Sequence, residues 1–169
     1  ASDDEAMKRF LRESRITASL RSPHTVSVYD CGSLTDGTLY LAMEVLSGRS
    51  LADIIRDEGP LPVDRICRMA RQICLSLEEA HASQLVHRDL KPQNISVEAI
   101  APGVEHVKVL DFGLAKPLHD DNLTLTAAGQ LCGTPVYMSP EQIQCQPVSA
   151  ASDLYSLGVV LYEMTVGRP

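Results

Sequence analysis

The chain has 169 residues, 44% of them hydrophobic, so it is long enough for one domain with a sizeable core. Because aromatic residues make up only 4% and tryptophan is absent, that core must be mainly aliphatic. The formal net charge of −7 leaves no basic surface for a phosphate backbone or an anionic membrane, which argues against nucleic-acid binding or membrane contact within these residues.

The first predicted element is a helix over residues 3–20, because apolar residues recur at helical spacing after an acidic first turn. Pro23 follows its end and restricts the residue before it. Two strands are predicted next, at 26–29 and 39–45. Turn residues at 35–38 join them, so we expect an antiparallel pair.

Two helices follow in the prediction. Ser50 caps a short one, with Asp53 as its acidic third residue, and Gly59 ends it. A longer helix over residues 63–83 carries an apolar stripe about six turns long and should be the central buried helix. That stripe includes Cys67 and Cys74, which we expect to pack in the core.

The remaining elements are shorter. Strands are predicted at 95–97 and 107–110, joined across the turn residues 101–103. Residues 111–141 form a long irregular stretch of the kind that is usually functional. A strongly apolar stretch over 152–165 predicts a buried helix.

Five scattered cysteines, without zinc spacing, favour a reduced setting, and we expect a cytoplasmic protein. The first ten residues are polar and acidic, unlike a signal peptide, and the apolar run 157–162 is too short to span a bilayer. A membrane anchor outside these residues is compatible with the sequence. The histidines show no metal spacing and are assigned no chemistry: His24, His81, His106 and His119.

The chemistry is concentrated in His-Arg-Asp-Leu-Lys-Pro-Gln-Asn, residues 87–94. Asp89 can orient an attacking hydroxyl and accept its proton, and Lys91 can meet a phosphate as a point charge. Asn94, together with Asp111 of a following Asp-Phe-Gly, offers the hard oxygen ligands that Mg²⁺ prefers. The two motifs together are a strong signal, and the alternative, a capped helix end beside a solvated acid, is disfavoured.

These motifs resemble the catalytic loop and metal-binding motif of protein kinases. The resemblance extends to residues 133–141, similar to the GT…APE segment with Ser139 in the Ala position, and to residues 152–158, similar to the DxxSLG start of a buried helix. The segments YMSPEQ and SDLYSLGVVLYEM resemble the corresponding segments of bacterial, Hanks-type serine/threonine kinases. Lys91 and Thr134 suggest serine/threonine specificity by the same resemblance.

The resemblance implies an α+β fold with an incomplete small β lobe and a mostly helical large lobe. Residues 1–46 would be the remainder of the small lobe with the hinge, and residues 47–169 the first part of the large lobe. It implies catalytic roles for Asp89, Lys91 and Asn94, and metal ligation by Asn94 and Asp111. Nucleotide-binding positions would be the gatekeeper Met43, the hinge residues Glu44, Val45 and Leu46, and Ser96 beneath adenine, where the family usually has an apolar residue.

Further roles follow from the resemblance alone. Arg88 beside Asp89 implies control by a phosphorylated loop, with Thr124 and Thr126 as the best acceptors. The other expected roles belong to five residues. Glu13 pairs with an ATP-positioning lysine, and Phe112 of Asp111-Phe112-Gly113 packs beneath the helix of Glu13 and sets active or inactive states. Thr134 packs on Asp89 and Lys91 as a substrate platform, Glu141 ends the Ser-Pro-Glu motif, and Asp153 braces the catalytic loop backbone.

The sequence also departs from the family. It contains no GxGxxG before a strand, no VAIK-like lysine and no counterpart of the last helices. Alone, these residues are expected to be inactive. Three hypotheses remain. The first is that the residues are part of a kinase that uses ATP with Mg²⁺ or Mn²⁺ to phosphorylate Ser/Thr hydroxyls of proteins, itself included. The second is a truncated or inactive kinase-like binding or scaffold protein, and the third is another phosphotransferase, such as a small-molecule kinase. Intact catalytic residues favour the first, and Lys91-Pro92 argues against the third.

Overall fold

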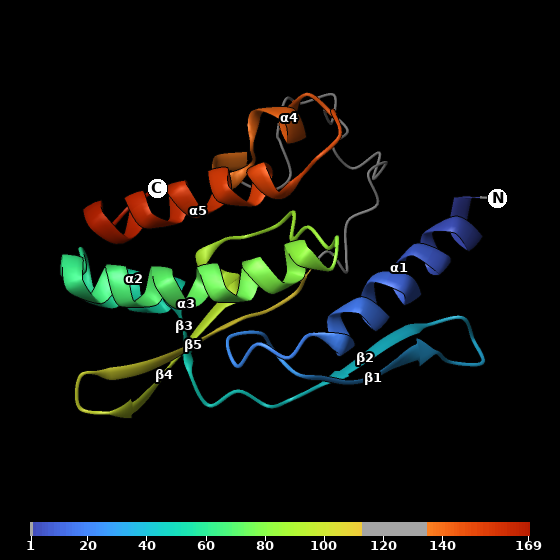
Figure 1. Ribbon diagram of the computed structural model, residues 1–169, viewed down its shortest axis with the longest axis horizontal. Coiled ribbons are helices and arrows are strands. Elements are labelled where there is room, and N and C mark those ends of the chain that lie inside the picture. Colours follow the sequence, from blue (N-terminus) through green and yellow to red (C-terminus); the bar gives the residue numbers. More distant parts are fainter. Residues whose placement is uncertain (1, 113–134) are drawn as a thin grey trace.

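The computed structural model describes residues 2–112 and 135–169. Helix α1 (Ser2–Ser19) lies against an antiparallel pair, β1 (Val28–Ser33) and β2 (Leu39–Met43), at one end of the molecule (Figure 1). The other elements form a larger part in which the longer helices lie to one side of a three-stranded sheet. The expected α+β architecture, with a small sheet part and a mostly helical part, is confirmed.

Strand β1 begins two residues later than predicted and runs further. The reason is tertiary, because the N–H of Val26 donates to the carbonyl of Val109 at 3.0 Å and the N–H of Glu44 donates to the carbonyl of Ser27 at 2.9 Å. Val26 therefore joins the small part to the large one before the hairpin starts. The turn at its tip is as predicted, with Gly37 in the left-handed region at φ 85°.

The short helix α2 (Leu51–Glu58) begins and ends as predicted. The hydroxyl of Ser50 accepts the N–H of Asp53 at 3.0 Å and donates to its carboxylate at 2.7 Å. Gly59, at φ 73°, closes the helix by donating to the carbonyl of Ile55. Two-residue strand β3 (Arg49–Ser50) leads directly into α2.

Helix α3 (Val63–Ala82) is the predicted long helix, but the predicted burial of Cys67 and Cys74 is wrong. Both thiols are exposed, whereas Met69 and Ile73 are fully buried. The buried face is the one that meets β5 on one side and α5 on the other, and it is rotated away from the two cysteines. Which face of α3 is buried therefore depends on the elements that pack against it and not on the apolar character of cysteine.

Strands β4 (Ile95–Ala101) and β5 (Val104–Val109) form a longer hairpin than predicted, in the order β3-β4-β5. Ile95 lies opposite Val109, and the N–H of Leu110 donates to the carbonyl of Asn94 at 2.9 Å. The residue that precedes β4 and the residues that follow β5 therefore meet at one end of the hairpin.

Helix α5 (Ala150–Val166) starts at a capping box of Ser149 and Ser152. The predicted buried helix is buried on one face only, because the other face carries exposed residues such as Leu154 (57% exposed) and Tyr162 (59%). The buried face joins the aliphatic core. The short helical elements are η1 (Pro92–Asn94), η2 (Pro135–Tyr137) and α4 (Pro140–Ile143). No helix among the described residues has the length and apolar composition needed to cross a bilayer.

Candidate active site

His87 anchors the segment 87–94, which we call the 87–94 loop, to the core. Its ring is fully buried and packs on the ring of Phe112 with centroids 4.7 Å apart. Because a carbonyl can only accept, Nε2 of His87 donates to the Leu110 carbonyl at 2.7 Å, and Nδ1 then accepts the N–H of Asp89 at 3.3 Å. Burial lowers the pKa of His87, although Asp153, Asp89 and Asp111 oppose this shift, and the neutral ring fits both contacts.

Asp153 of α5 reaches the backbone of the 87–94 loop. Its carboxylate accepts the N–H of His87 at 2.8 Å and the N–H of Arg88 at 2.9 Å. Nε2 of His81 lies 2.7 Å from the same carboxylate. A buried charge with three close polar partners is well compensated, so this group ties α3, α5 and the loop together. His81 was assigned no role from the sequence, and no local signal connects it with a residue 72 positions away.

The side chains of Lys91 and Asn94 converge on Asp89. Nζ of Lys91 lies 2.7 Å from its carboxylate, and Nδ2 of Asn94 donates to its carbonyl at 2.9 Å. All three side chains come from the turn that leads through η1 into β4, so eight residues of sequence bring them together. The arrangement holds an oriented carboxylate beside a cation, which can position a hydroxyl near an anionic group.

Asn94 and Asp111 lie at the same end of the β4–β5 hairpin, since the N–H of Leu110 is bonded to the Asn94 carbonyl. Nδ2 of Asn94 is used by Asp89, so its Oδ1 is the atom suited to a metal ion. Among the described residues no cluster of three or more His, Cys, Asp or Glu could hold a metal. An amide oxygen and a carboxylate are hard oxygen donors, so Asn94 and Asp111 fit Mg²⁺, which takes water and phosphate oxygens as its other ligands.

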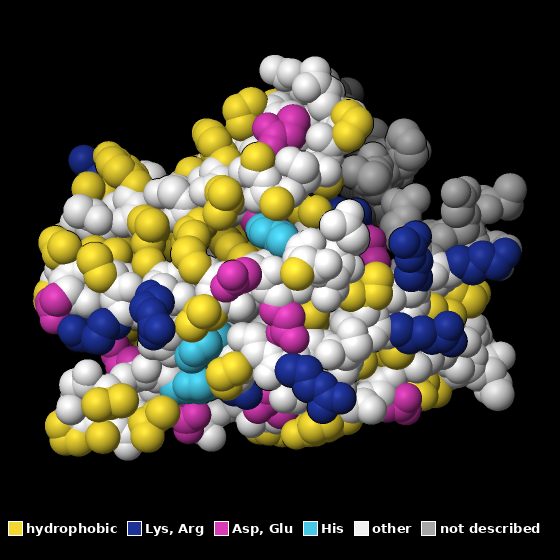
Figure 2. Space-filling model, in the orientation of Figure 1, with side chains coloured by type: hydrophobic (Ala, Val, Ile, Leu, Met, Phe, Trp, Pro, Cys, Tyr) yellow, Lys and Arg dark blue, Asp and Glu magenta, His cyan; other side chains and the backbone are white. Residues whose placement is uncertain are grey.

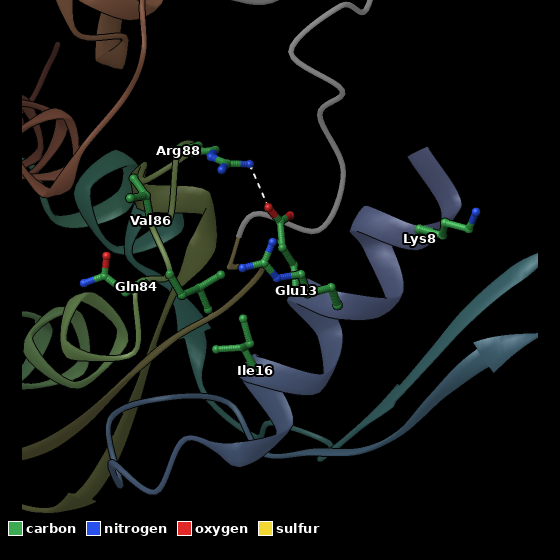
Figure 3. Close-up of a pocket in the computed structure, with 8 residues that line it drawn as sticks. Lys8, Glu13, Ile16, Gln84, Val86 and Arg88 are labelled. Carbon is green, nitrogen blue, oxygen red and sulfur yellow. Dashed lines mark hydrogen bonds and ion pairs between the residues drawn. The ribbon is translucent and has the colours of Figure 1, made fainter. Parts of the chain in front are cut away.

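Glu13 of α1 is bonded to Arg88. Oε1 accepts from Nη1 at 2.9 Å, and the two side chains are 12% and 23% exposed. The pair borders a cavity of about 370 Å³ between α1 and the chain before the 87–94 loop; Figure 3 shows the two side chains directed at each other. Nε of Arg88 is buried without a partner among the described residues. Exposed basic residues of α1, including Lys8 and Arg12, lie on the same side, where Figure 2 shows basic side chains gathered.

The predicted hinge lies between β2 and β3. Oε1 of Glu44 accepts from Nζ of Lys108 at 2.5 Å and from the N–H of Ser27 at 2.6 Å. Burial raises the pKa of Glu44, but these hydrogen bonds outweigh it and hold the pKa below its ordinary value. Met43 ends β2 and Leu46 is half-buried.

Gly48 lets the chain after the hinge lie against β4. A Cβ at this position would stand 2.6 Å from Oγ of Ser96 and 2.7 Å from the carbonyl oxygen of Val97, closer than side chains approach. Ser96 is buried beneath this segment. The segment that follows the predicted hinge therefore lies against the predicted adenine floor at a residue without a side chain.

Gln142 was missed as a site residue. Its Nε2 donates to the carbonyl of Arg88 at 2.7 Å, and its Oε1 accepts the N–H of Ser139 at 3.0 Å. The spacing Ser139-x-x-Gln142 is a capping-box signal visible in the sequence, but nothing local indicates the contact with the loop. Its neighbour Glu141 accepts from the hydroxyl of Ser152 at 2.5 Å. Four predicted site residues lie outside the described residues: Gly113, Thr124, Thr126 and Thr134.

The arrangement around Asp89, with the buried ring of His87 behind it and Asp111 and Phe112 just after β5, is that of a protein kinase-like catalytic segment. The family model described as "Protein kinase domain" matches residues 1–169, and the chain belongs to that family. This bears out the expected family and argues further against a small-molecule kinase.

Several curated relatives are bacterial. Serine/threonine-protein kinase pkn3 of Myxococcus xanthus is 44% identical over 168 residues, which is 98% of this chain and 31% of that protein. Serine/threonine-protein kinase PknB of Mycobacterium tuberculosis is 40% identical over 172 residues, 100% of this chain and 27% of PknB. The chain thus spans about a third or less of the length of these relatives.

Two solved structures superpose on nearly the whole of this chain. A crystal structure of a mutant Mycobacterium tuberculosis PknI kinase domain superposes with a TM-score of 0.78 at 28% identity, covering 99% of this chain and 60% of that one. A crystal structure of Rad53 in complex with AMP-PNP superposes with a TM-score of 0.74 at 30% identity, covering 96% of this chain and 38% of that chain.

Proposed function

We propose that the protein containing these residues transfers the γ-phosphate of ATP to serine and threonine hydroxyls of proteins, its own included, as part of signalling. The observation that carries this proposal is the convergence of Lys91 and Asn94 on Asp89, with 2.7 Å between the Lys91 ammonium and the carboxylate. Relatives named as serine/threonine-protein kinases support the choice of acceptor.

In this proposal Asp89 orients the attacking hydroxyl and accepts its proton. Lys91, whose Nζ is 2.7 Å from that carboxylate, would offset the charge of an incoming phosphate as well. Asn94 fixes the Asp89 backbone through its amide nitrogen and offers Oδ1, with the Asp111 carboxylate, to a divalent ion. Bound Mg²⁺, or Mn²⁺, would neutralise phosphate charge.

The nucleotide would lie along the hinge. Backbone groups of Glu44 and Leu46 would contact adenine behind Met43, with Ser96 as its floor. The ion pair between Glu44 and Lys108 supports this role because it holds the hinge backbone in one position. With the hinge at residues 44–46, residues 1–46 would be part of a small lobe and residues 47–169 part of a large lobe. A hydroxyl at position 96 offers less apolar contact than an aliphatic side chain, so we expect weaker adenine packing.

Regulation would pass through Arg88. A phosphate on Thr124 or Thr126 would compete with Glu13 for the guanidinium, whose Nε is still without a partner among the described residues. Thr134 would complete the substrate platform beside Asp89, and the packing of Phe112 would set the active or inactive state of the site.

Free thiols at the four described cysteines support a cytoplasmic setting: Cys31, Cys67, Cys74 and Cys145.

A kinase-like binding protein without transferase activity is the second candidate. One observation favours it: the Glu13 carboxylate is already bonded to Arg88 of the 87–94 loop, 2.9 Å away. Nucleotide binding without phosphate transfer in the complete protein would support this candidate.

The experiment is phosphate transfer from labelled ATP to a basic protein by the complete protein, with Asp89→Asn and Asp64→Asn variants. Asp64 is an exposed carboxylate on α3 and serves as the matched control. We expect Asp89→Asn to lower kcat by about 10²–10⁴-fold while nucleotide affinity is retained, and Asp64→Asn to match the unsubstituted protein. Undiminished incorporation by Asp89→Asn would overturn the assigned role.

A further inference from the structure

The side-chain amide of Gln142 joins two segments that are 54 residues apart. Its oxygen accepts the N–H of Ser139 and closes the N-terminal cap of α4, while its nitrogen donates to the carbonyl of Arg88 at 2.7 Å. The two ends of one amide group therefore have different tasks. Only the nitrogen reaches the 87–94 loop.

The carbonyl that Gln142 holds belongs to a strained residue. Arg88 has φ 67°, in the left-handed region that non-glycine residues rarely adopt. Such a conformation persists only where the surroundings hold it. Here the N–H of Arg88 is bonded to Asp153 and its carbonyl to Gln142, so the backbone is held on both sides.

The same carbonyl belongs to the peptide group that joins Arg88 to Asp89. Because a peptide group is planar, fixing its C=O and its N–H fixes the direction in which the next residue leaves. Gln142 holds the C=O, and Nδ1 of His87 holds the N–H of Asp89 at 3.3 Å. Both polar atoms of this peptide are thus bonded to side chains.

We propose that Gln142 is a positioning residue for Asp89: its amide nitrogen sets the orientation of the Arg88–Asp89 peptide and so the direction of the Asp89 carboxylate. This inference rests on the proposed function for its kinetic consequence. It also couples residues 135–142 to the base, so that the segment next to Ser139 and the 87–94 loop move as one unit.

Replacement of Gln142 by Glu separates positioning from capping. A glutamate keeps the oxygen that accepts the Ser139 N–H, and Ser-x-x-Glu is itself a favourable capping box. It lacks the donor and sets a carboxylate against the Arg88 carbonyl. The matched control is Gln144→Glu, the same change two residues further on, at an exposed position that ends α4.

In the complete protein, we expect Gln142→Glu to lower kcat by about 10- to 100-fold, with KM for ATP changed by no more than about twofold. The melting temperature should match that of Gln144→Glu, whose kcat should equal that of the unsubstituted protein. An unchanged kcat in Gln142→Glu, an effect confined to KM, or an equal loss in Gln144→Glu would overturn the proposal.

Amide hydrogen exchange of residues 87–91 decides the structural part without any activity. We expect faster exchange there in Gln142→Glu and no change in Gln144→Glu. If the unsubstituted protein transfers no phosphate, the proposed function fails, but faster exchange confined to these residues still supports positioning by Gln142. Unchanged exchange in Gln142→Glu contradicts it whether or not the protein is active.

Discussion

The carboxylate of Glu13 and the guanidinium of Arg88 lie 2.9 Å apart although they are 75 residues apart in the sequence. This ion pair joins α1 to the 87–94 loop at the edge of a cavity (Figure 3). It occupies the cation that a phosphorylated loop would need. The same two residues therefore contribute both to the stability of the described structure and to its proposed control.

We expect Glu13→Gln to lower the free energy of unfolding by about 1–2 kcal/mol. The reason is that a partly buried guanidinium, which already has one buried nitrogen without a partner among the described residues, loses its charged acceptor. Urea unfolding measures the change. The control is Glu78→Gln, an exposed glutamate on α3, and equal losses in the two variants would show that the Glu13 contact adds nothing.

Asp153→Asn should cost more, about 2–4 kcal/mol. The carboxylate accepts from two backbone N–H groups and lies beside Nε2 of His81, whereas an amide has one acceptor oxygen and would turn an NH₂ toward a donor. Thermal and urea unfolding test this. Asp64→Asn, which removes only an exposed pair with Arg68, should change stability far less. A result for Asp153→Asn as small as this control contradicts the bracing role.

The free energy of unfolding should fall as the pH is lowered below 6.5. Burial lowers the pKa of His87 in the folded state, so the unfolded chain binds the proton first. Stability is therefore complete above the unfolded pKa of 6.5 and is lost progressively as the pH falls toward the folded-state pKa. Unfolding curves between pH 8 and 5, about the range that histidine titration covers, measure the slope.

Replacement identifies the source of that slope. His87→Gln should remove a large part of it, because the group that titrates is gone. His24 adds a part of the same sign, since its burial lowers its pKa despite a bond to the Val107 carbonyl, and His106, Arg71 and Lys108 lower it further. His24→Gln should therefore reduce the slope as well. A slope that survives the double replacement would assign it to other groups.

Gly48→Ala should destabilise the protein by about 1–3 kcal/mol, the usual cost of overpacking. The new Cβ would stand 2.6 Å from Oγ of Ser96 and 2.7 Å from a backbone oxygen, which cannot move without shifting β4. Gly158→Ala is the matched control, since a Cβ there meets nothing within 4 Å and alanine favours a helix interior. We expect Gly158→Ala to be neutral or stabilising, and a Gly48→Ala protein of unchanged stability would show that the segment around residue 48 can move away from β4.

Local rules determined several elements from the sequence. The cap of α2 at Ser50, the length of α3 and the meeting of Asp89, Lys91 and Asn94 all depend on residues within a few turns of one another. Helical periodicity and turn chemistry carry such information because the interacting groups are near in the chain. The motif spacing also predicted the family.

Only the tertiary structure decided the rest. It exposed Cys67, moved the start of β1 past Val26, bonded Glu13 to Arg88 and brought Gln142 to the 87–94 loop. Each of these depends on which elements pack together, because a helix face is buried only where a partner covers it and a strained backbone residue is stable only where distant side chains hold it. The residue types at the site are therefore local information, whereas the orientation of Asp89 is a property of the whole fold.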